Sequence, residues 1–209
     1  MSGIFIVFEG GDSVGKSTQV ERLTGWLQDQ GVAHVVTRQP GGTPVGVELR
    51  RLVLDPATGD VDTRAEALIY AADKAQHVYE LIRPALARGE VVVSDRYVDS
   101  MIAYQGAGRA LDIDEVSEIA WWAVWGLKPD LTVLLDADPA DAVATIRDKD
   151  RLEGAGIGLH RRARRFFLDL AAAEPGRYLV LNARLTRDEL ADAIAARVAE
   201  LLSSHGIVG

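Results

Sequence analysis

The stretch Ile4-Phe5-Ile6-Val7-Phe8-Glu9-Gly10-Gly11-Asp12-Ser13-Val14-Gly15-Lys16-Ser17 decides the fold of this chain. Its residues 4–8 form a continuous apolar run rich in β-forming types, which predicts a strand buried on both faces. The rest matches the pattern G-x-x-x-x-G-K-S/T, and a helix is expected to follow from about Lys16 to Gln30. A buried strand before this pattern and a helix after it are the context in which it marks a phosphate-binding loop.

This loop has the chemistry to hold a nucleoside triphosphate. Its glycines let backbone N–H groups turn inward to form an anion-binding nest, and the N-terminus of the next helix adds partial positive charge. Lys16 can reach the β- and γ-phosphates, and the hydroxyl of Ser17 is the expected magnesium ligand. We therefore predict that ATP and Mg²⁺ bind through Gly10, Gly11, Asp12, Ser13, Val14, Gly15, Lys16, Ser17 and Thr18.

The loop alone does not separate kinases from GTPase switches or motor ATPases. An Asn-Lys-x-Asp motif, which would specify guanine, occurs nowhere in the sequence. The predicted strand 91–93 is followed by Asp95-Arg96-Tyr97 and not by an Asp-x-x-Gly switch element. A non-kinase nucleotide-binding switch that acts through partner proteins is therefore the less favoured class.

Apolar runs and helical segments alternate along the whole chain. Because parallel neighbours in a sheet need crossover connections, this order predicts an α/β fold with a doubly wound, five-stranded parallel sheet flanked by helices. The predicted strands cover residues 4–8, 32–37, 91–93, 131–135 and 178–181. The predicted helices cover residues 16–30, 45–54, 63–88, 99–105, 112–126, 139–148, 159–173 and 187–203.

The domain organisation is simple. No shift in composition marks a second domain, so residues 1–209 are predicted to form a single kinase-sized domain. The glycine-rich segment Gly154–Gly158 lies between charged helical pieces, and we interpret residues of about 148–160 as a short mobile lid.

Composition and charge limit the partners. The formal net charge of −8 argues against non-specific binding to nucleic acid or to an anionic membrane, so a polyanion must bind in a local basic pocket. Cysteine is absent, which excludes a disulfide framework, a thiolate metal site and a cysteine nucleophile. The N-terminus lacks the basic region of a signal peptide, and the apolar segment Ile119–Leu127 is too short to span a bilayer. A cytoplasmic protein with a small-molecule substrate is the simplest interpretation.

A second candidate site follows the predicted strand 91–93. In open α/β sheets ligands collect at the carboxyl ends of strands, which should place Asp95 and Arg96 beside the phosphate-binding loop. A carboxylate there can hold magnesium or its waters, and a guanidinium can clamp a second phosphate. The alternative is a structural Asp–Arg pair at a strand end.

Further motifs run along nearly the whole chain. They are Thr37-Arg38-Gln39-Pro40-Gly41-Gly42-Thr43, Ala71-Ala72-Asp73-Lys74-Ala75-Gln76-His77, Asp95-Arg96-Tyr97, Ala103-Tyr104-Gln105-Gly106, Lys128-Pro129-Asp130-Leu131-Thr132 and Asp150-Arg151-Leu152-Glu153. With the phosphate-binding loop, this ordered set resembles the bacterial thymidylate kinases, which are P-loop nucleoside monophosphate kinases.

The resemblance implies transfer of the ATP γ-phosphoryl group to thymidine 5′-monophosphate (dTMP), which gives dTDP for dTTP synthesis. The acceptor phosphate has a second pKa of about 6, so it is largely a dianion at neutral pH and needs no general base. Alignment of the two polyanions and screening of their charge are the main tasks left to the protein. This explains why the informative residues are Lys, Arg and Asp.

The resemblance also implies roles for individual residues. Arg96 and Arg50 should hold the acceptor phosphate, with Asp12 near the sugar or magnesium; Tyr70 should stack on the base, with core packing as its alternative. The implied substrate-binding residues are Asp12, Arg38, Pro40, Arg50, Tyr70, Lys74, Arg96, Ser100, Tyr104 and Gln105. The implied catalytic residues are Lys16, Asp95, Arg96 and Arg151, and the implied magnesium ligands are Ser17 and Asp95.

The family divides by the position of a catalytic arginine, which lies either in the phosphate-binding loop or in the lid. Positions 12–14 of this loop contain no arginine, and basic residues gather around the predicted lid. The chain therefore resembles the lid-arginine class, with Arg151 as the expected charge-stabilising residue. For Arg162 and Arg165 we favour an ordinary solvated helix face.

Some positions depart from the family pattern. Ser13 replaces a glycine, Gln39 a glutamate and Lys74 an arginine, and Met101 occupies a usually small polar position. Because lysine cannot reproduce a bidentate, stacked guanidinium contact, Lys74 keeps open a kinase for another pyrimidine monophosphate with altered base selectivity.

Three tryptophans, Trp121, Trp122 and Trp125, close the predicted helix 112–126. Adjacent residues cannot share one helix face, so at least one of them must leave the core or meet a partner. An incidentally exposed tryptophan is one interpretation. The resemblance favours the other, a homodimer formed through helices.

Overall fold

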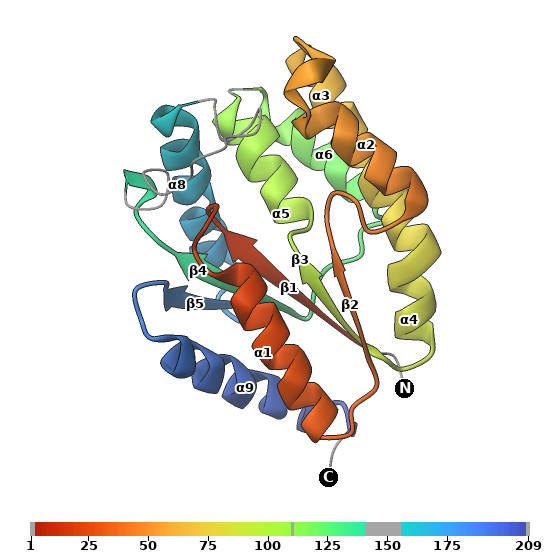
Figure 1. Ribbon diagram of the computed structural model, residues 1–209, viewed down its shortest axis with the longest axis vertical. Coiled ribbons are helices and arrows are strands. Elements are labelled where there is room, and N and C mark those ends of the chain that lie inside the picture. Colours follow the sequence, from red (N-terminus) through yellow and green to blue (C-terminus); the bar gives the residue numbers. More distant parts are fainter. Residues whose placement is uncertain (1–2, 110, 141–155, 208–209) are drawn as a thin grey trace.

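The computed structural model describes residues 3–109, 111–140 and 156–207. Five parallel strands form a sheet in the order β2-β3-β1-β4-β5, which confirms the predicted doubly wound α/β fold (Figure 1). The strands are β1 (Ile4–Gly10), β2 (His34–Arg38), β3 (Val91–Asp95), β4 (Leu131–Asp136) and β5 (Tyr178–Asn182).

Strand β1 lies at the centre of the sheet and supplies both cores. Ile4, Ile6 and Phe8 face one side and Phe5 and Val7 the other, as the two-residue period of a strand requires. All five side chains are buried, which agrees with the continuous apolar run in the sequence. A parallel strand between two helical layers is expected to be apolar on both faces.

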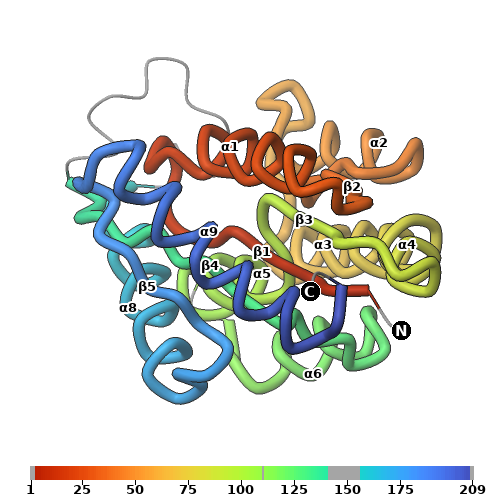
Figure 2. Tube along the Cα trace, turned by 90° about the horizontal axis from the view of Figure 1, so that it is seen from below, coloured from red at the N-terminus to blue at the C-terminus, as the bar shows by residue number. Residues whose placement is uncertain are grey.

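Helices cover the two faces of the sheet in separate layers. The first layer holds α1 (Lys16–Asp29) and α9 (Arg187–Ser204), which pack against each other and against the side of β1 that carries Phe8. The second holds α3 (Thr63–His77), α6 (Ile113–Ala123) and α8 (Ile157–Ala173) on the side of Phe5. Figure 2 shows α1 above the strands, with α6 and α8 below them.

The prediction of one continuous α-helix over residues 63–88 is wrong over one turn, which is π-helical. Between α3 and α4 (Arg83–Ala87) the chain forms a π-helical turn over Val78–Ile82. Pro84 explains the wider turn, since proline lacks an amide hydrogen and its ring clashes with the carbonyl group four residues earlier. A second π-helical stretch, Ile102–Gly108, follows the short helix α5 (Val98–Met101).

The other predicted elements agree with the structure to within a few residues. Helix α2 spans Pro44–Leu54, and Thr43 caps it by accepting a hydrogen bond from the Gly46 amide. Of the predicted helix 139–148, the structure describes residues 139 and 140, which are helical, and the rest lies outside the described residues. Arg151 and the predicted lid up to residue 155 also lie outside them. Residues 157–160 already form the first turn of α8. In the described ranges no helix is long and apolar enough to cross a membrane.

The sheet brings the predicted site residues to one edge. In the register of β1, β2 and β3, Phe8 and Arg38 both pair with Asp95. The phosphate-binding loop (residues 10–17) leaves β1 at this edge, and α1 begins directly after it. The carboxyl edge of the sheet therefore carries the candidate site, as the doubly wound topology predicts.

Candidate active site

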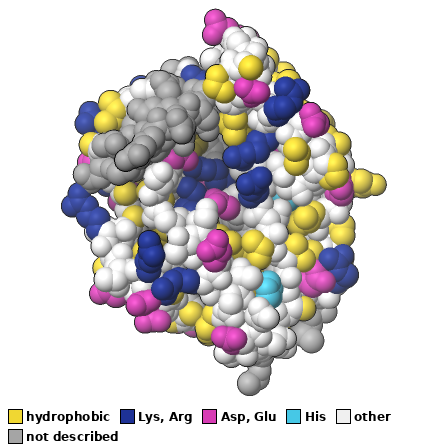
Figure 3. All heavy atoms as spheres, viewed as in Figure 1, with side chains coloured by type: hydrophobic (Ala, Val, Ile, Leu, Met, Phe, Trp, Pro, Cys, Tyr) yellow, Lys and Arg dark blue, Asp and Glu magenta, His cyan; other side chains and the backbone are white. Residues whose placement is uncertain are grey.

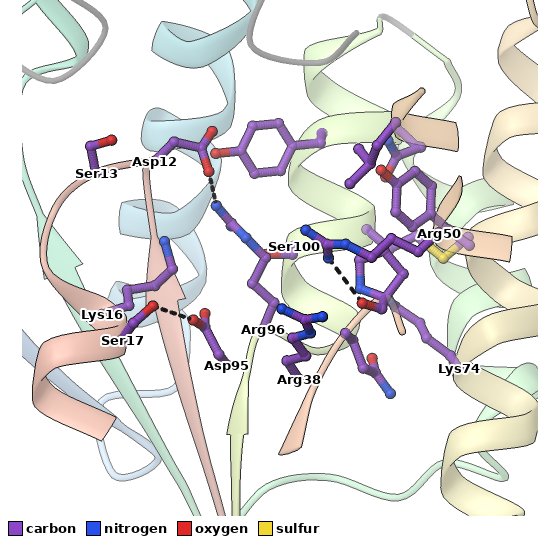
Figure 4. Close-up of a pocket in the computed structure, with 17 residues that line it drawn as sticks. Asp12, Ser13, Lys16, Ser17, Arg38, Arg50, Lys74, Asp95, Arg96 and Ser100 are labelled. Atoms are coloured by element: carbon purple, nitrogen blue, oxygen red, sulfur yellow. Dashed lines mark hydrogen bonds and ion pairs between the residues drawn. The ribbon is translucent and has the colours of Figure 1, made fainter. Parts of the chain in front are cut away.

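A pocket of about 310 Å³ opens at the carboxyl edge of the sheet. Figure 3 shows Lys and Arg side chains gathered around a hollow in this face, with acidic side chains beside them. The pocket unites the phosphate-binding loop with all ten predicted substrate-binding residues. Its lining includes Asp12, Lys16, Ser17, Arg38, Pro40, Arg50, Tyr70, Lys74, Asp95, Arg96, Ser100, Met101, Tyr104 and Gln105 (Figure 4).

The phosphate-binding loop has the backbone of an anion nest. Gly10 has a φ of 132°, and a Cβ atom there would lie 2.4 Å from the Leu135 carbonyl oxygen, so only glycine fits. Ser13 also adopts a left-handed φ, of 58°. Serine retains the turn at a conformational cost of about 1 kcal/mol.

Lys16 is turned onto its own loop. Its Nζ donates to the carbonyl oxygen of Gly11 at 2.5 Å and to that of Gly10 at 3.4 Å. Burial and the charge of Arg96 lower the pKa of Lys16 to about 8, although neighbouring carboxylates act in the opposite direction. An anionic phosphate in the loop would offer this ammonium group a stronger partner than the two carbonyl oxygens.

Ser17 and Asp95 meet as the sequence predicts. The Ser17 Oγ donates to Asp95 Oδ2 at 3.2 Å, and Asp95 Oδ1 is buried without a hydrogen bond from any described residue (Figure 4). A hydroxyl and a carboxylate with a free oxygen are hard ligands that suit Mg²⁺. Within the described ranges no group of three or more His, Cys, Asp or Glu side chains forms a metal cage. A magnesium ion held here would take its other ligands from phosphate and water.

Arg96 lies between the phosphate-binding loop and the rest of the pocket. Its Nη1 donates to the Gly10 carbonyl oxygen at 3.0 Å and to Ser100 Oγ at 2.9 Å, while Nη2 donates to Asp12 Oδ1. The guanidinium also lies over the ring of Tyr104, 5.3 Å from its centroid. Arg96 has a left-handed φ of 70°. This backbone conformation is strained for a residue other than glycine, and such strained residues cluster at functional sites.

The charge of Arg96 also fixes the state of Asp12. Burial alone would raise the pKa of the Asp12 carboxyl, but Arg96 and Lys16 outweigh it, with a smaller contribution from His160, and the pKa falls below its usual value. Asp12 is therefore a carboxylate at neutral pH.

Glu9, for which the sequence predicted no role, holds the chain segment that follows Arg96. Fully buried, it accepts hydrogen bonds from the Tyr97 amide at 2.9 Å and from the Ser100 amide at 3.2 Å, as well as from Ser100 Oγ. Burial raises the pKa of Glu9, and the charge of Arg96 works against that rise. A lone glutamate that ends an apolar strand was the signal in the sequence for this role.

The loop after β2 forms the opposite wall of the pocket. Its Gln39–Pro40 peptide bond is cis, and Arg50 Nη1 donates to the Pro40 carbonyl oxygen at 2.9 Å. Asp73 of α3 holds the loop by accepting a hydrogen bond from the Gly41 amide at 2.9 Å. The sequence reasoning missed Asp73, although it lies inside the motif at residues 71–77.

His77 ties the same loop to α3 and also went unnoticed in the sequence. Gln39 Nε2 donates to His77 Nδ1 at 2.7 Å, so the ring proton is on Nε2, which donates to Thr37 Oγ1 at 2.7 Å. Burial and the charge of Lys74 lower the pKa of His77 to about 4, which keeps it neutral. A Cβ atom on Gly42 would lie 2.4 Å from His77 Nε2, so the close approach requires glycine.

The end of the pocket farthest from the phosphate-binding loop carries fewer charged side chains than the end beside the loop. Tyr70 and Lys74 share one face of α3, as their spacing predicts, and Lys74 Nζ lies 5.8 Å from the centroid of the Tyr70 ring. Lys74 is only 2% exposed, and burial lowers its pKa. Gln105 Nε2 donates to Glu66 Oε1 at 3.1 Å, an interaction that fixes the orientation of the amide group.

The helix α8 carries basic residues that differ in role. Arg165 is exposed and pairs with Asp169 at 3.0 Å, which agrees with a solvated helix face. Arg162 is exposed as well, and its guanidinium in addition donates to the carbonyl oxygens of Ala107 and Gly108 at 3.0 and 2.5 Å. These carbonyls end a helical segment, where a cation is favoured.

The parallel sheet, the phosphate-binding loop and the further basic side chains in the same pocket define a P-loop kinase of the nucleoside monophosphate kinase class. The family model "Thymidylate kinase" matches residues 8–194 of the chain. The chain belongs to the thymidylate kinase family.

Relatives of nearly the same length carry the same name. A thymidylate kinase of Cutibacterium acnes is 58% identical over 203 residues, which cover 97% of this chain and all of the relative. One of Clavibacter michiganensis is 53% identical and covers 98% of both chains. The crystal structure of thymidylate kinase from Ehrlichia chaffeensis has a TM-score of 0.77 at 29% identity, covering 97% of this chain and all of that one.

Proposed function

We propose that this protein transfers the γ-phosphoryl group of ATP to dTMP, with Mg²⁺ as the metal ion. The observation that carries the proposal is the position of Arg96, in one pocket with both the phosphate-binding loop and the cations Arg38 and Arg50. Two polyanions can thus bind on either side of one guanidinium. The switch protein and the altered pyrimidine kinase, which the sequence left open, are not favoured by the family to which the chain belongs.

On the donor side, the loop amides and Lys16 bind the ATP phosphates, and Ser17 and Asp95 hold Mg²⁺ directly or through its waters. A magnesium ion held by these two side chains would supply charge neutralisation for the transferred group. The ammonium of Lys16 leaves the carbonyl oxygens of Gly10 and Gly11 and takes phosphate oxygens in their place.

On the acceptor side, Arg96 and Arg50 bind the phosphate of dTMP, while Tyr70 packs on the base. Lys74 lies at the edge of the base and donates to a carbonyl oxygen. Because Glu66 already takes the amide group of Gln105, the Gln105 carbonyl oxygen is left to accept from the base. Arg151, outside the described residues, remains our candidate for stabilising charge on the transferred group.

A coupled ADP-release assay over a panel of nucleoside monophosphates tests the function. We expect dTMP to stimulate ADP release strongly, with dCMP and CMP weaker by at least about tenfold, since one mispaired polar group costs more than 1 kcal/mol. We expect dUMP to be weaker by about tenfold as well, because it lacks the 5-methyl group, and a missing methyl-sized group costs about 1–3 kcal/mol. Magnesium removal by EDTA should abolish the signal. Nucleotide binding without acceptor-dependent ADP release would contradict the kinase, and a preference for another pyrimidine would contradict dTMP.

We also propose that the protein is a homodimer that pairs through α3 and α6. Trp122 is 81% exposed and Trp125 58%, and Leu68 of α3 and Tyr79, just after α3, are exposed as well. Trp121, Trp122 and Trp125 line a shallow apolar pocket together with Ala75 of α3. An apolar surface with two exposed tryptophans is typical of a protein interface.

Light scattering tests the dimer. The wild type should have twice the chain mass of 22.6 kDa, and Trp122→Lys should shift the protein to a single chain by placing a charge in the interface. Leu185→Lys, at an exposed leucine that follows β5, is the matched control and should leave the mass unchanged. A wild-type mass of one chain would overturn the proposal. Because ATP and dTMP are intracellular metabolites, we further propose a cytoplasmic location.

A further inference from the structure

His160 is a buried histidine that the proposed chemistry does not use. It lies in the first turn of α8 and is 5% exposed. Its Nε2 atom is fully buried and has no hydrogen bond from any described residue. Because an unpaired buried polar atom is costly, its retention calls for an explanation, such as a bound water or a functional role.

The surroundings of His160 point to that partner. A cavity of about 20 Å³, enough for one water molecule, lies behind the phosphate-binding loop and is lined by His160 together with Gly10, Gly11 and Asp12. Arg164 also lines it, but both ends of its guanidinium are taken by Asp136, at 2.7 and 2.9 Å. His160 is the other basic side chain in the described part of this lining.

His160 also belongs to a stack of side chains that ends at Arg96. The imidazole meets the ring of Tyr104 edge-on, with centroids 6.1 Å apart, and Arg96 lies over the same ring. Arg96 in turn is hydrogen-bonded to Asp12. The stack therefore links His160 through Tyr104 and Arg96 to Asp12, which lines the same small cavity as His160.

Binding of an acceptor changes which hydrogen-bond donors are available to the Asp12 carboxylate. If Arg96 turns its Nη2 to an acceptor phosphate, as the proposed function requires, the Asp12 carboxylate loses a charged donor while it stays largely buried. A largely buried carboxylate without a donor is disfavoured. The buried Nε2 of His160 lines the same small cavity as Asp12 and, in the tautomer that carries its proton there, can supply a new donor.

We infer that His160 is a positioning residue that donates a hydrogen bond from Nε2 to Asp12, directly or through one water, when Arg96 engages the acceptor phosphate. The exchange of donors keeps Asp12 in place and lets Arg96 leave it. His160 touches neither substrate in this arrangement. The inference rests on the proposed kinase function, so dTMP-dependent ADP release by the wild type is measured first.

Steady-state kinetics of two variants test the exchange. His160→Leu removes the donor, and kcat/KM for dTMP should fall about 10- to 100-fold, the range for losing a hydrogen bond to a buried charge. His160→Gln can place an amide N–H near the former Nε2 position and should recover to within about threefold of the wild type. The Kd for ATP without acceptor should change less than about twofold in both variants, because Arg96 still holds Asp12 in that state.

A double-mutant cycle and one spectroscopic measurement separate positioning from mere packing. In the Asp12→Asn background, His160→Leu should cause little further loss in kcat/KM, since the acceptor of the hydrogen bond is already changed. In the wild type, nitrogen-detected NMR of the histidine side chains should show the His160 Nε2–H become protected from exchange when dTMP is added. This measurement uses the wild type alone, so it tests the inference even if a variant folds poorly.

Three results would overturn the inference: His160→Leu within twofold of the wild type, His160→Gln as impaired as His160→Leu, or full additivity with Asp12→Asn. An unprotected Nε2–H in the dTMP complex would do the same. A wild type without dTMP-dependent turnover would instead contradict the proposed function, and the two failures are therefore distinguishable.

Discussion

Lys16→Met is expected to lower kcat by about three orders of magnitude, because an ammonium group aimed at the β- and γ-phosphates stabilises charge that grows in the transition state. Lys16 is buried in the loop and donates to two loop carbonyl oxygens, so methionine fills its space but leaves those oxygens without the donor. The loss should therefore include weaker ATP binding and not kcat alone.

Lys128→Met is the matched control, since Lys128 is an exposed lysine paired with Glu174 away from the pocket. Its kcat and KM should stay within about twofold of the wild type, as for most exposed ion pairs. A fall of less than tenfold in kcat for Lys16→Met would contradict the assigned role. Circular dichroism and thermal unfolding of the variant show whether the fold is retained.

The pKa of Lys16 gives the same residue a pH signature. With a pKa of about 8 in the ligand-free protein, Lys16 loses its charge as the pH rises through 8. ATP then binds a neutral amine, and the Kd for ATP should rise between pH 7 and pH 9. Titration calorimetry of Lys16→Arg should show no such rise, because arginine keeps its charge over this range.

The phosphate-binding loop and the five strands were predictable because their signals are local. A glycine-rich loop between an apolar strand and a helix needs no distant residue, and parallel strands that end at one edge bring Asp95 to Ser17 by topology alone. For Tyr70 the two interpretations do not exclude each other, since its ring packs in the core and also lines the pocket.

Other features depend on contacts that a linear pattern does not contain. Glu9 is a ligand of backbone amides about 90 positions away, and Arg162 binds carbonyl groups at a helix end that the sequence did not place. His160 and His77 are single histidines whose roles come from the side chains packed around them. The π-helical turn at residues 78–82, by contrast, had a local signal in Pro84.

Arg96→Gln is the second change with a large expected effect, a loss of about 10³ in kcat/KM for dTMP. Glutamine cannot provide the charged, forked donor that joins the loop carbonyl of Gly10 to an acceptor phosphate. Arg96→Lys should recover no more than about tenfold of this loss, because a lysine offers a point charge without the planar fork.

The effect of Arg96→Gln should separate the two substrates. The Kd for ATP measured without dTMP should change only a few-fold, since Lys16 and the loop amides remain, whereas the Kd for dTMP should rise steeply. Arg22→Gln, which removes an exposed cation of α1 paired with Asp188, controls for net charge and should leave both constants unchanged. Equal losses for ATP and dTMP would indicate that Arg96 serves the phosphate-binding loop alone, and would remove the bridge on which the proposed phosphoryl transfer depends.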